Sequence, residues 1–150
     1  MEHRGPVNSV LFSDDGETLL TASDDGFARL WQTSNSAFIS RFEHETAVKH
    51  AAFSPDGQLI ATATVDGAIH LWNLTTGVKI DRLTGHEGIV HYVTFNPQGT
   101  QLVSASGDGT VRIWSLATGE TVRTLSGHVG AVLAVDFRPN ARRLATEGVD

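Results

Sequence analysis

The chain repeats itself with a period of 41 or 42 residues, and this period constrains the fold more than any other sequence feature. Trp31, Trp72 and Trp114 are separated by 41 and 42 residues. Two further series keep the same steps, namely His3, His44, His86 and His128, and Asp25, Asp66, Asp108 and Asp150. A period of this length is typical of stacked units that each bury their apolar face only against their neighbours. The sequence therefore predicts three complete units and the first half of a fourth.

Each unit has the local pattern of short strands. Runs of about six residues rich in Val, Ile, Leu, Phe and Thr alternate with Gly, Asp, Pro and Asn turn residues. Asp-Gly pairs suit tight hairpins because both residues tolerate positive φ, and they occur at 25–26, 66–67 and 108–109. In the third unit the pattern predicts strands over 90–95, 101–106, 110–115 and 121–125. A second turn series lies at 13–16, 54–57, 96–99 and 138–141. We expect a four-stranded antiparallel meander per unit, fourteen strands in all, and no long helix.

These features carry a family resemblance. A period near 42, four strands per unit, Gly85-His86 and Gly127-His128 before a first strand, and a Trp closing the third strand mark one repeat type. The chain resembles the WD-repeat β-propeller family over essentially all of its 150 residues. The resemblance implies an all-β β-propeller of four-stranded antiparallel blades, with an incomplete ring of three full blades plus half a blade. We expect one partial propeller domain over 1–150, with repeats at 1–42, 43–83, 84–125 and a truncated 126–150.

The resemblance also implies a hydrogen-bonded network of His, Ser or Thr, Asp and Trp inside each blade. The four groups can satisfy one another's hydrogen bonds. The carboxylate accepts from the imidazole N–H, the indole N–H donates to the hydroxyl, and the hydroxyl both donates and accepts. The expected sets are His3, Ser23, Asp25 and Trp31; His44, Thr64, Asp66 and Trp72; and His86, Ser106, Asp108 and Trp114. In the fourth unit Gly148 replaces the expected hydroxyl and no Trp follows. We predict that the fourth blade is the weakest.

The sequence departs from the family pattern at several positions. The residue after each Trp is Gln32, Asn73 or Ser115 where the family has Asp. The first two units read Glu-His instead of Gly-His before their first strands.

Composition excludes several function classes. The chain has 11 basic and 17 acidic residues and a formal charge of −6, which argues against general binding of nucleic acid or anionic lipid. It has no Cys, which excludes disulfides, thiolate zinc sites and a cysteine nucleophile. We find no signal-peptide pattern at the start and no run of 18 apolar residues. We expect a soluble, cytoplasmic protein that does not bind membranes.

No catalytic or metal site is predicted. The His–Asp pairs recur in every unit, which is typical of structural positions and not of a single active site. A zinc site from His50, His70 and His91 would need them to converge from different repeats. The acidic pairs at 14–15 and 24–25 lie in turns, and 107–109 is a hairpin and not a phosphate loop. We expect the basic residues at 138, 142 and 143 to form a solvated edge. We therefore predict a non-enzyme with no cofactor and no metal.

The ring does not close with these units. Propellers usually have four to eight blades, and an open arc would leave two large hydrophobic flanks uncovered. We expect the remaining blades to come from a longer chain, with self-association as the alternative.

The predicted function is a non-enzymatic protein–protein interaction scaffold. In similar propellers, peptides and partner domains bind the face where the loops before the first strands meet the Asp-Gly turns. Polar positions there differ between the repeats, as a recognition surface should, and they are Asn8, Asp24, Glu45, Lys49, Glu87, His91 and Tyr92. The expected partners are other proteins or peptides. One alternative is small-molecule or glycan binding at the channel through Lys49, His50, His91 and Asp136. The other is a sensor or regulatory module of a larger signalling protein.

Overall fold

The fold consists of four antiparallel sheets that follow one another along the chain. A computed structural model describes residues 2–137 and 144–149. Three sheets have four strands each, and the last has two. We call these sheets blades 1 to 4. Blade 1 contains β1 (Val7–Phe12), β2 (Thr18–Ser23), β3 (Phe27–Gln32) and β4 (Phe38–Glu43). Blade 2 contains β5 (Val48–Phe53), β6 (Leu59–Thr64), β7 (Ile69–Asn73) and β8 (Lys79–Leu83).

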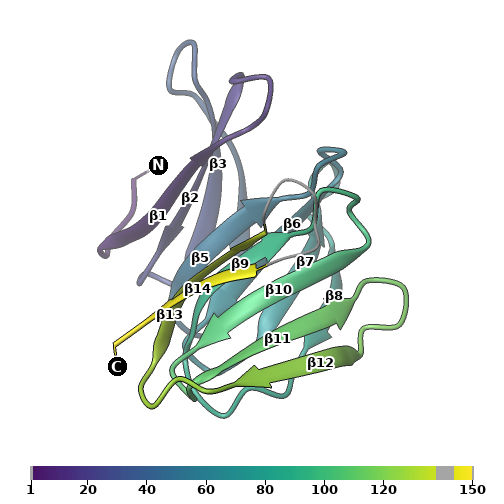
Figure 1. Cartoon of the computed structure of the whole chain (residues 1–150). Coiled ribbons are helices and arrows are strands. Elements are labelled where there is room, and N and C mark those ends of the chain that lie inside the picture. Colours follow the sequence, from purple (N-terminus) through teal and green to yellow (C-terminus); the bar gives the residue numbers. More distant parts are fainter. Residues whose placement is uncertain (1, 138–143, 150) are drawn as a thin grey trace.

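The later blades repeat this order. Blade 3 contains β9 (Val90–Phe95), β10 (Gln101–Ser106), β11 (Thr110–Ser115) and β12 (Thr121–Ser126). Blade 4 contains β13 (Val132–Phe137) and β14 (Leu144–Gly148). Within each blade consecutive strands pair, as Figure 1 shows. These strands confirm the predicted all-β class and the incomplete propeller. The turn at 138–141 and the basic residues at 138, 142 and 143 lie outside the described residues.

The Asp-Gly hairpins form where the sequence predicts them. Gly67 joins β6 to β7 with φ of 81°, a left-handed conformation that disfavours residues with a side chain. A Cβ atom at this position would also lie 2.7 Å from the carbonyl oxygen of His86 in the next blade. The turn therefore requires glycine for its backbone conformation and for close approach of the neighbouring blade.

Every first strand begins with a β-bulge, which the sequence analysis did not predict. In β1 the pairing with β2 jumps from Val7 to Ser9, so Asn8 is left unpaired. The same shift recurs in the other blades, where the skipped residues are Lys49, His91 and Leu133. A bulge changes the direction in which the side chain of the extra residue points, so this side chain no longer follows the alternation of faces along the strand. Four equivalent positions thus carry four different side chains.

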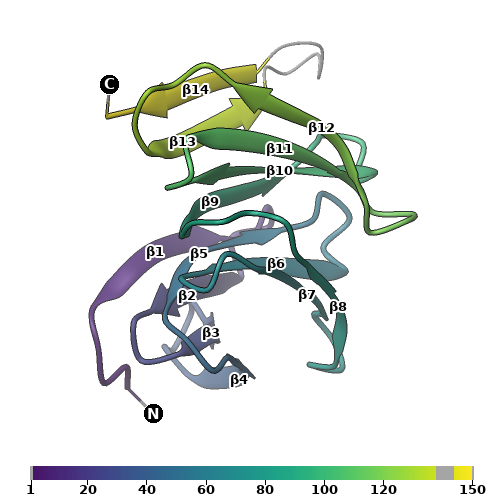
Figure 2. The same cartoon turned by 90° about the horizontal axis from the view of Figure 1, so that it is seen from below.

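The blades stack through apolar clusters that lie between neighbours. Blades 1 and 2 share a cluster that includes Leu20, Phe42 and Trp72. Blades 2 and 3 share the largest one, which includes Trp114, and blades 3 and 4 share one centred on Val132 and Val135. The first strands β1, β5, β9 and β13 lie next to one another, and Figure 2 shows the blades following one another around an open arc. No blade has a core of its own, as expected for a repeat architecture.

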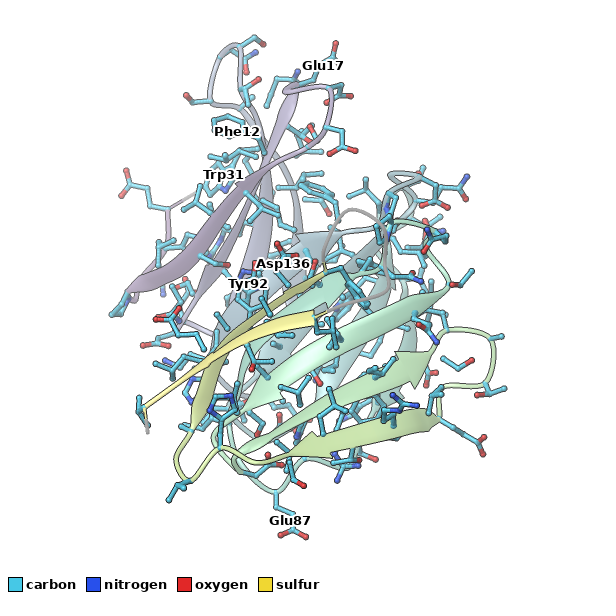
Figure 3. The ribbon with its side chains drawn as sticks, in the orientation of Figure 1. Phe12, Glu17, Trp31, Glu87, Tyr92 and Asp136 are labelled. Carbon is cyan, nitrogen blue, oxygen red and sulfur yellow. The ribbon has the colours of Figure 1, made fainter. Side chains whose placement is uncertain are left out.

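The flank of blade 1 is apolar and uncovered. Phe12 is 64% exposed, whereas Phe95, its counterpart in blade 3, is 6% exposed because it packs on blade 2. Val7 and Val10 are exposed beside it. Figure 3 shows Phe12 and Trp31 together on this side of blade 1. The predicted hydrophobic flank is therefore present here.

The flank of blade 4 differs from the prediction. Glu147 stands where blades 1 to 3 have Ala22, Ala63 and Ala105, each fully buried against the next blade. Asp136 is also exposed on this blade. Over its described residues, 132–137 and 144–149, blade 4 does not present the second large hydrophobic flank that was predicted, because an apolar neighbour could not bury these carboxylates without a partner for their charge.

Candidate functional site

Blade 3 contains a complete His, hydroxyl, Asp and Trp network. The Trp114 indole N–H donates to Ser104 Oγ (2.8 Å), and Ser104 Oγ lies 2.8 Å from His86 Nε2. His86 Nδ1 donates to Asp108 Oδ2 (2.7 Å). Burial alone would raise the pKa of Asp108, but hydrogen bonds from Thr110 and His86 lower it to about 2. The network therefore holds an ionised carboxylate and ties the loop before β9 to the β10–β11 turn.

The hydroxyl in each network is two residues earlier than the sequence analysis assigned. The residues that bridge His and Trp are Thr21, Thr62 and Ser104, and not Ser23, Thr64 and Ser106. Ser106 Oγ instead donates to the Gly88 carbonyl (3.2 Å) and accepts from the Asp108 backbone N–H (3.1 Å). Residues i and i+2 of a strand face the same side, so the repeat spacing alone could not separate the two hydroxyl series.

Blade 4 keeps this hydroxyl. Thr146 Oγ1 lies 2.9 Å from His128 Nε2, in the relation that Thr21 has to His3. The expectation that the fourth unit lost its hydroxyl at Gly148 is therefore wrong, because position 148 corresponds to Ser106, which does not bridge His and Trp.

Blade 2 departs from the network. His44 Nε2 lies 2.7 Å from Thr62 Oγ1, and the Trp72 indole N–H donates to the same oxygen (3.0 Å). Asp66, however, accepts from Arg82 Nη2 (2.9 Å) and from Thr64 Oγ (2.5 Å), and no bond joins it to His44 among the described residues. The predicted His44–Asp66 pair is therefore not formed in this blade.

The bulge residues lie at the same end of the four first strands. Asp24 Oδ1 accepts from Asn8 Nδ2 (2.7 Å) in its own blade and from Lys49 Nζ (2.7 Å) in blade 2. The hydrogen bond from Lys49 lowers the pKa of Asp24. Burial lowers the pKa of His91, and the nearby charge of Lys49 lowers it further. We call Asn8, Asp24, Lys49, His91 and Leu133 the rim; its first four members were predicted as partner-binding residues.

The other predicted residues lie apart from this cluster. Tyr92 stacks on His50 with ring centroids 3.9 Å apart, and burial raises its pKa, with a further contribution from Asp136. Figure 3 shows Tyr92 and Asp136 over the middle of the first strands and Glu87 at one end of the molecule. Glu45 and Glu87 are exposed in the loops between blades. The sequence analysis missed Leu133, whose position in the series of Asn8, Lys49 and His91 was the available signal.

The channel candidates do not assemble into a binding or catalytic group. His50 is buried and its Nδ1 lies 3.1 Å from the Val93 carbonyl oxygen, while Lys49 is bonded to Asp24. Over residues 2–137 and 144–149, no three His, Asp or Glu side chains are arranged to hold a metal ion. The same residues contain no helix that is long and apolar enough to cross a membrane.

Comparison with known proteins agrees with the repeated blades. The family described as "WD domain, G-beta repeat" matches residues 1–32, 36–73, 77–115 and 119–150. The chain belongs to the WD40 repeat family. The second and third WD40 matches begin just before the outermost strand of one blade and end at the third strand of the next, so a sequence repeat and a blade are out of phase. Each of these two sequence repeats therefore contributes strands to two neighbouring blades, which it joins covalently.

Individual WD40 relatives match over short segments. A 40-residue segment is 50% identical to WD repeat-containing protein 38 of Mus musculus, and a 34-residue segment is 53% identical to WD repeat-containing protein 86 of Homo sapiens. These segments are 27% and 23% of this chain, but only 13% and 9% of the relatives. WD40 repeats generally mediate protein–protein interactions, and WD40 proteins are typically non-enzymatic scaffolds.

Proposed function

We propose that this WD40 chain is a non-enzymatic scaffold that binds a partner protein or peptide through its rim. The observation that carries the proposal is a chain of interactions across blades, which joins Asn8 and Asp24 of blade 1 to Lys49 of blade 2. Asn8 and Lys49 both bond to the Asp24 carboxylate, and Lys49 also acts on His91. A surface shared by several blades is wide enough to recognise an extended segment of another protein.

The contrast between framework and rim supports the same function. The Trp, His, Asp and hydroxyl positions repeat from blade to blade because the fold depends on them. The four bulge positions carry an amide, an ammonium, an imidazole and an isobutyl group, which serve no common structural purpose. Bulges next to binding sites commonly re-aim side chains, so variation at these positions favours recognition.

The polarity of this face indicates the kind of partner. Charged and polar groups gather over blades 1 and 2, whereas blade 4 presents Val129, Leu133 and Val149, all exposed. Val149 lies against the loop of Val129, since a Cβ on the intervening Gly130 would approach a Val149 methyl to 2.8 Å. A partner segment with an apolar anchor beside polar and charged groups would match this arrangement.

The test is a charge reversal at the centre of the rim. Lys49→Glu should release the bound partner while lowering the free energy of unfolding by no more than about 2 kcal/mol, because the Lys49–Asp24 pair that it replaces with two carboxylates is partly exposed. Arg123→Glu, on the exposed outer strand of blade 3, is the matched control. Proteins bound to wild type and to each variant are quantified by mass spectrometry, and urea unfolding is measured in parallel. Loss with Lys49→Glu alone supports the proposal, and equal binding by both variants refutes it.

A further inference from the structure

Blades 1 and 3 place an arginine beside their network, and blade 2 does not. In blade 1 Arg29 Nη1 donates to Asp25 Oδ2 (2.7 Å) and contacts His3 Nδ1. In blade 3 the equivalent residue, Arg112, lies over the Trp114 ring with its Cζ 5.9 Å from a ring centroid, and its Nη1 donates to Thr121 Oγ1 (3.4 Å). The equivalent residue of blade 2 is His70, which is shorter.

A pocket of about 460 Å³ lies beside His70 in blade 2. It is bounded by the loop before β5 and by side chains of β7 and β8. Its lining residues are Glu43, His44, Glu45, Thr46, Asp66, His70, Lys79 and Arg82. The pocket thus lies next to the same histidine and aspartate positions that the arginine bonds in blade 1.

Two buried imidazoles of this pocket have an unsatisfied nitrogen. His44 and His70 are 9% and 6% exposed, and the Nδ1 atom of each has no hydrogen-bond partner among the described residues. In blade 1 the nitrogen equivalent to His44 Nδ1 contacts both Asp25 and Arg29. Thr62 Oγ1 donates to the His70 carbonyl (3.4 Å), so His44 Nε2 donates to Thr62 Oγ1 and the neutral ring has its acceptor lone pair on Nδ1.

The pocket lining carries more carboxylates than cationic side chains. Three carboxylates line it, against two cationic side chains, Lys79 and Arg82. Burial lowers the pKa of both His44 and His70 to about 4, so both rings are neutral acceptors or donors near pH 7. Arg82 already bonds to Asp66, and Lys79 lies over the Trp72 ring with its Nζ 5.0 Å from the ring centroid. In blade 1 the equivalent carboxylate, Asp25, accepts from Arg29 and from two backbone N–H groups, so this position can accept several donors.

We propose that the pocket binds the guanidinium group of an arginine side chain, which takes the place that Arg29 fills in blade 1. The guanidinium donates to the Asp66 carboxylate and to His44 Nδ1. That the arginine belongs to a partner protein rests on the proposed scaffold function, whereas the pocket's preference for guanidinium does not. The site lies at the outer strands of blade 2 and is separate from the rim.

The probe is N-acetyl-arginine methylamide, titrated into the protein while the side-chain resonances of His44 and His70 are followed by NMR. We expect saturable shifts of both histidines and at least tenfold weaker binding of the citrulline analogue, which has the same shape without the charge. His70→Arg gives blade 2 the residue of blades 1 and 3 and should abolish binding while the protein remains folded. Binding that survives His70→Arg, or no saturable shift in wild type, overturns the proposal.

A second variant separates a guanidinium site from an anion site. Arg82→Thr gives blade 2 the residue that blade 3 has at position 124, and it removes the internal competitor for Asp66. A guanidinium site should then bind the arginine probe several-fold more tightly. If the pocket instead holds anions through Lys79 and Arg82, inorganic phosphate should shift the histidines in wild type and lose affinity in Arg82→Thr, which would refute the proposal. Lys49→Glu should leave probe binding unchanged, so failure of the rim and failure of the pocket are distinguishable.

Discussion

Removing the Ser104 hydroxyl is the most direct perturbation of the blade network. Ser104 is fully buried, and its Oγ joins the Trp114 indole N–H and His86 Nε2 at 2.8 Å each. Ser104→Ala leaves both nitrogens buried without that partner. An unsatisfied buried polar group costs about 1–3 kcal/mol, so we expect a loss of about 2–6 kcal/mol in the free energy of unfolding.

Ser106→Ala is the matched control, because Ser106 is equally buried and only two residues away. Its Oγ bonds only backbone groups of the partly buried turn, at 3.1 and 3.2 Å, so its loss should cost about 1 kcal/mol. Both variants are compared with wild type by urea unfolding followed through tryptophan fluorescence, with the same m-value required for all three. A cost for Ser106→Ala equal to or above that for Ser104→Ala would refute the assignment of the network hydroxyl.

Three further predictions test burial, packing and blade completeness. Burial lowers the pKa of His50 from its ordinary 6.5 to about 4, so the unfolded state binds more protons than the folded state in this range. The free energy of unfolding should therefore decrease as the pH is lowered from about 6.5 to about 4. In urea titrations, His50→Gln should reduce the slope of this decrease by up to about one proton. Phe95→Ala should destabilise by about 3–5 kcal/mol, whereas Phe12→Ala on the open flank should cost under about 1 kcal/mol and reduce binding of the hydrophobic dye ANS; equal costs would contradict the packing argument. Amide exchange should be fastest in β13 and β14, and protection of Val135 equal to that of Val93 would contradict the weak-blade prediction.

The comparison of blades 2 and 3 shows which features of the hydrogen-bonded network can be predicted from the sequence. The Asp-Gly hairpin and the strand pattern of both blades follow from local residue chemistry, and the structure confirms them. Asp66 bonds to Arg82, which lies across the β7–β8 pair from His70, whereas Asp108 of blade 3 bonds to its histidine, His86. The partner of the aspartate therefore depends on which side chains of neighbouring strands are long enough to contact it. The spacing of the repeats does not contain this information.

The repeat length, the four-strand unit and the all-β class follow from the residues alone, because they depend on periodicity and on turn residues that act over a few positions. The packing of strands and blades was needed to show which hydroxyl joins His and Trp, where the bulges fall, and that the alanine positions aligned with Glu147 are fully buried. Residues two apart on a strand share a face, and a bulge shifts that alternation by one residue. The contacts of a side chain therefore depend on the strand and blade packed against it, and not on its place in the repeat alone.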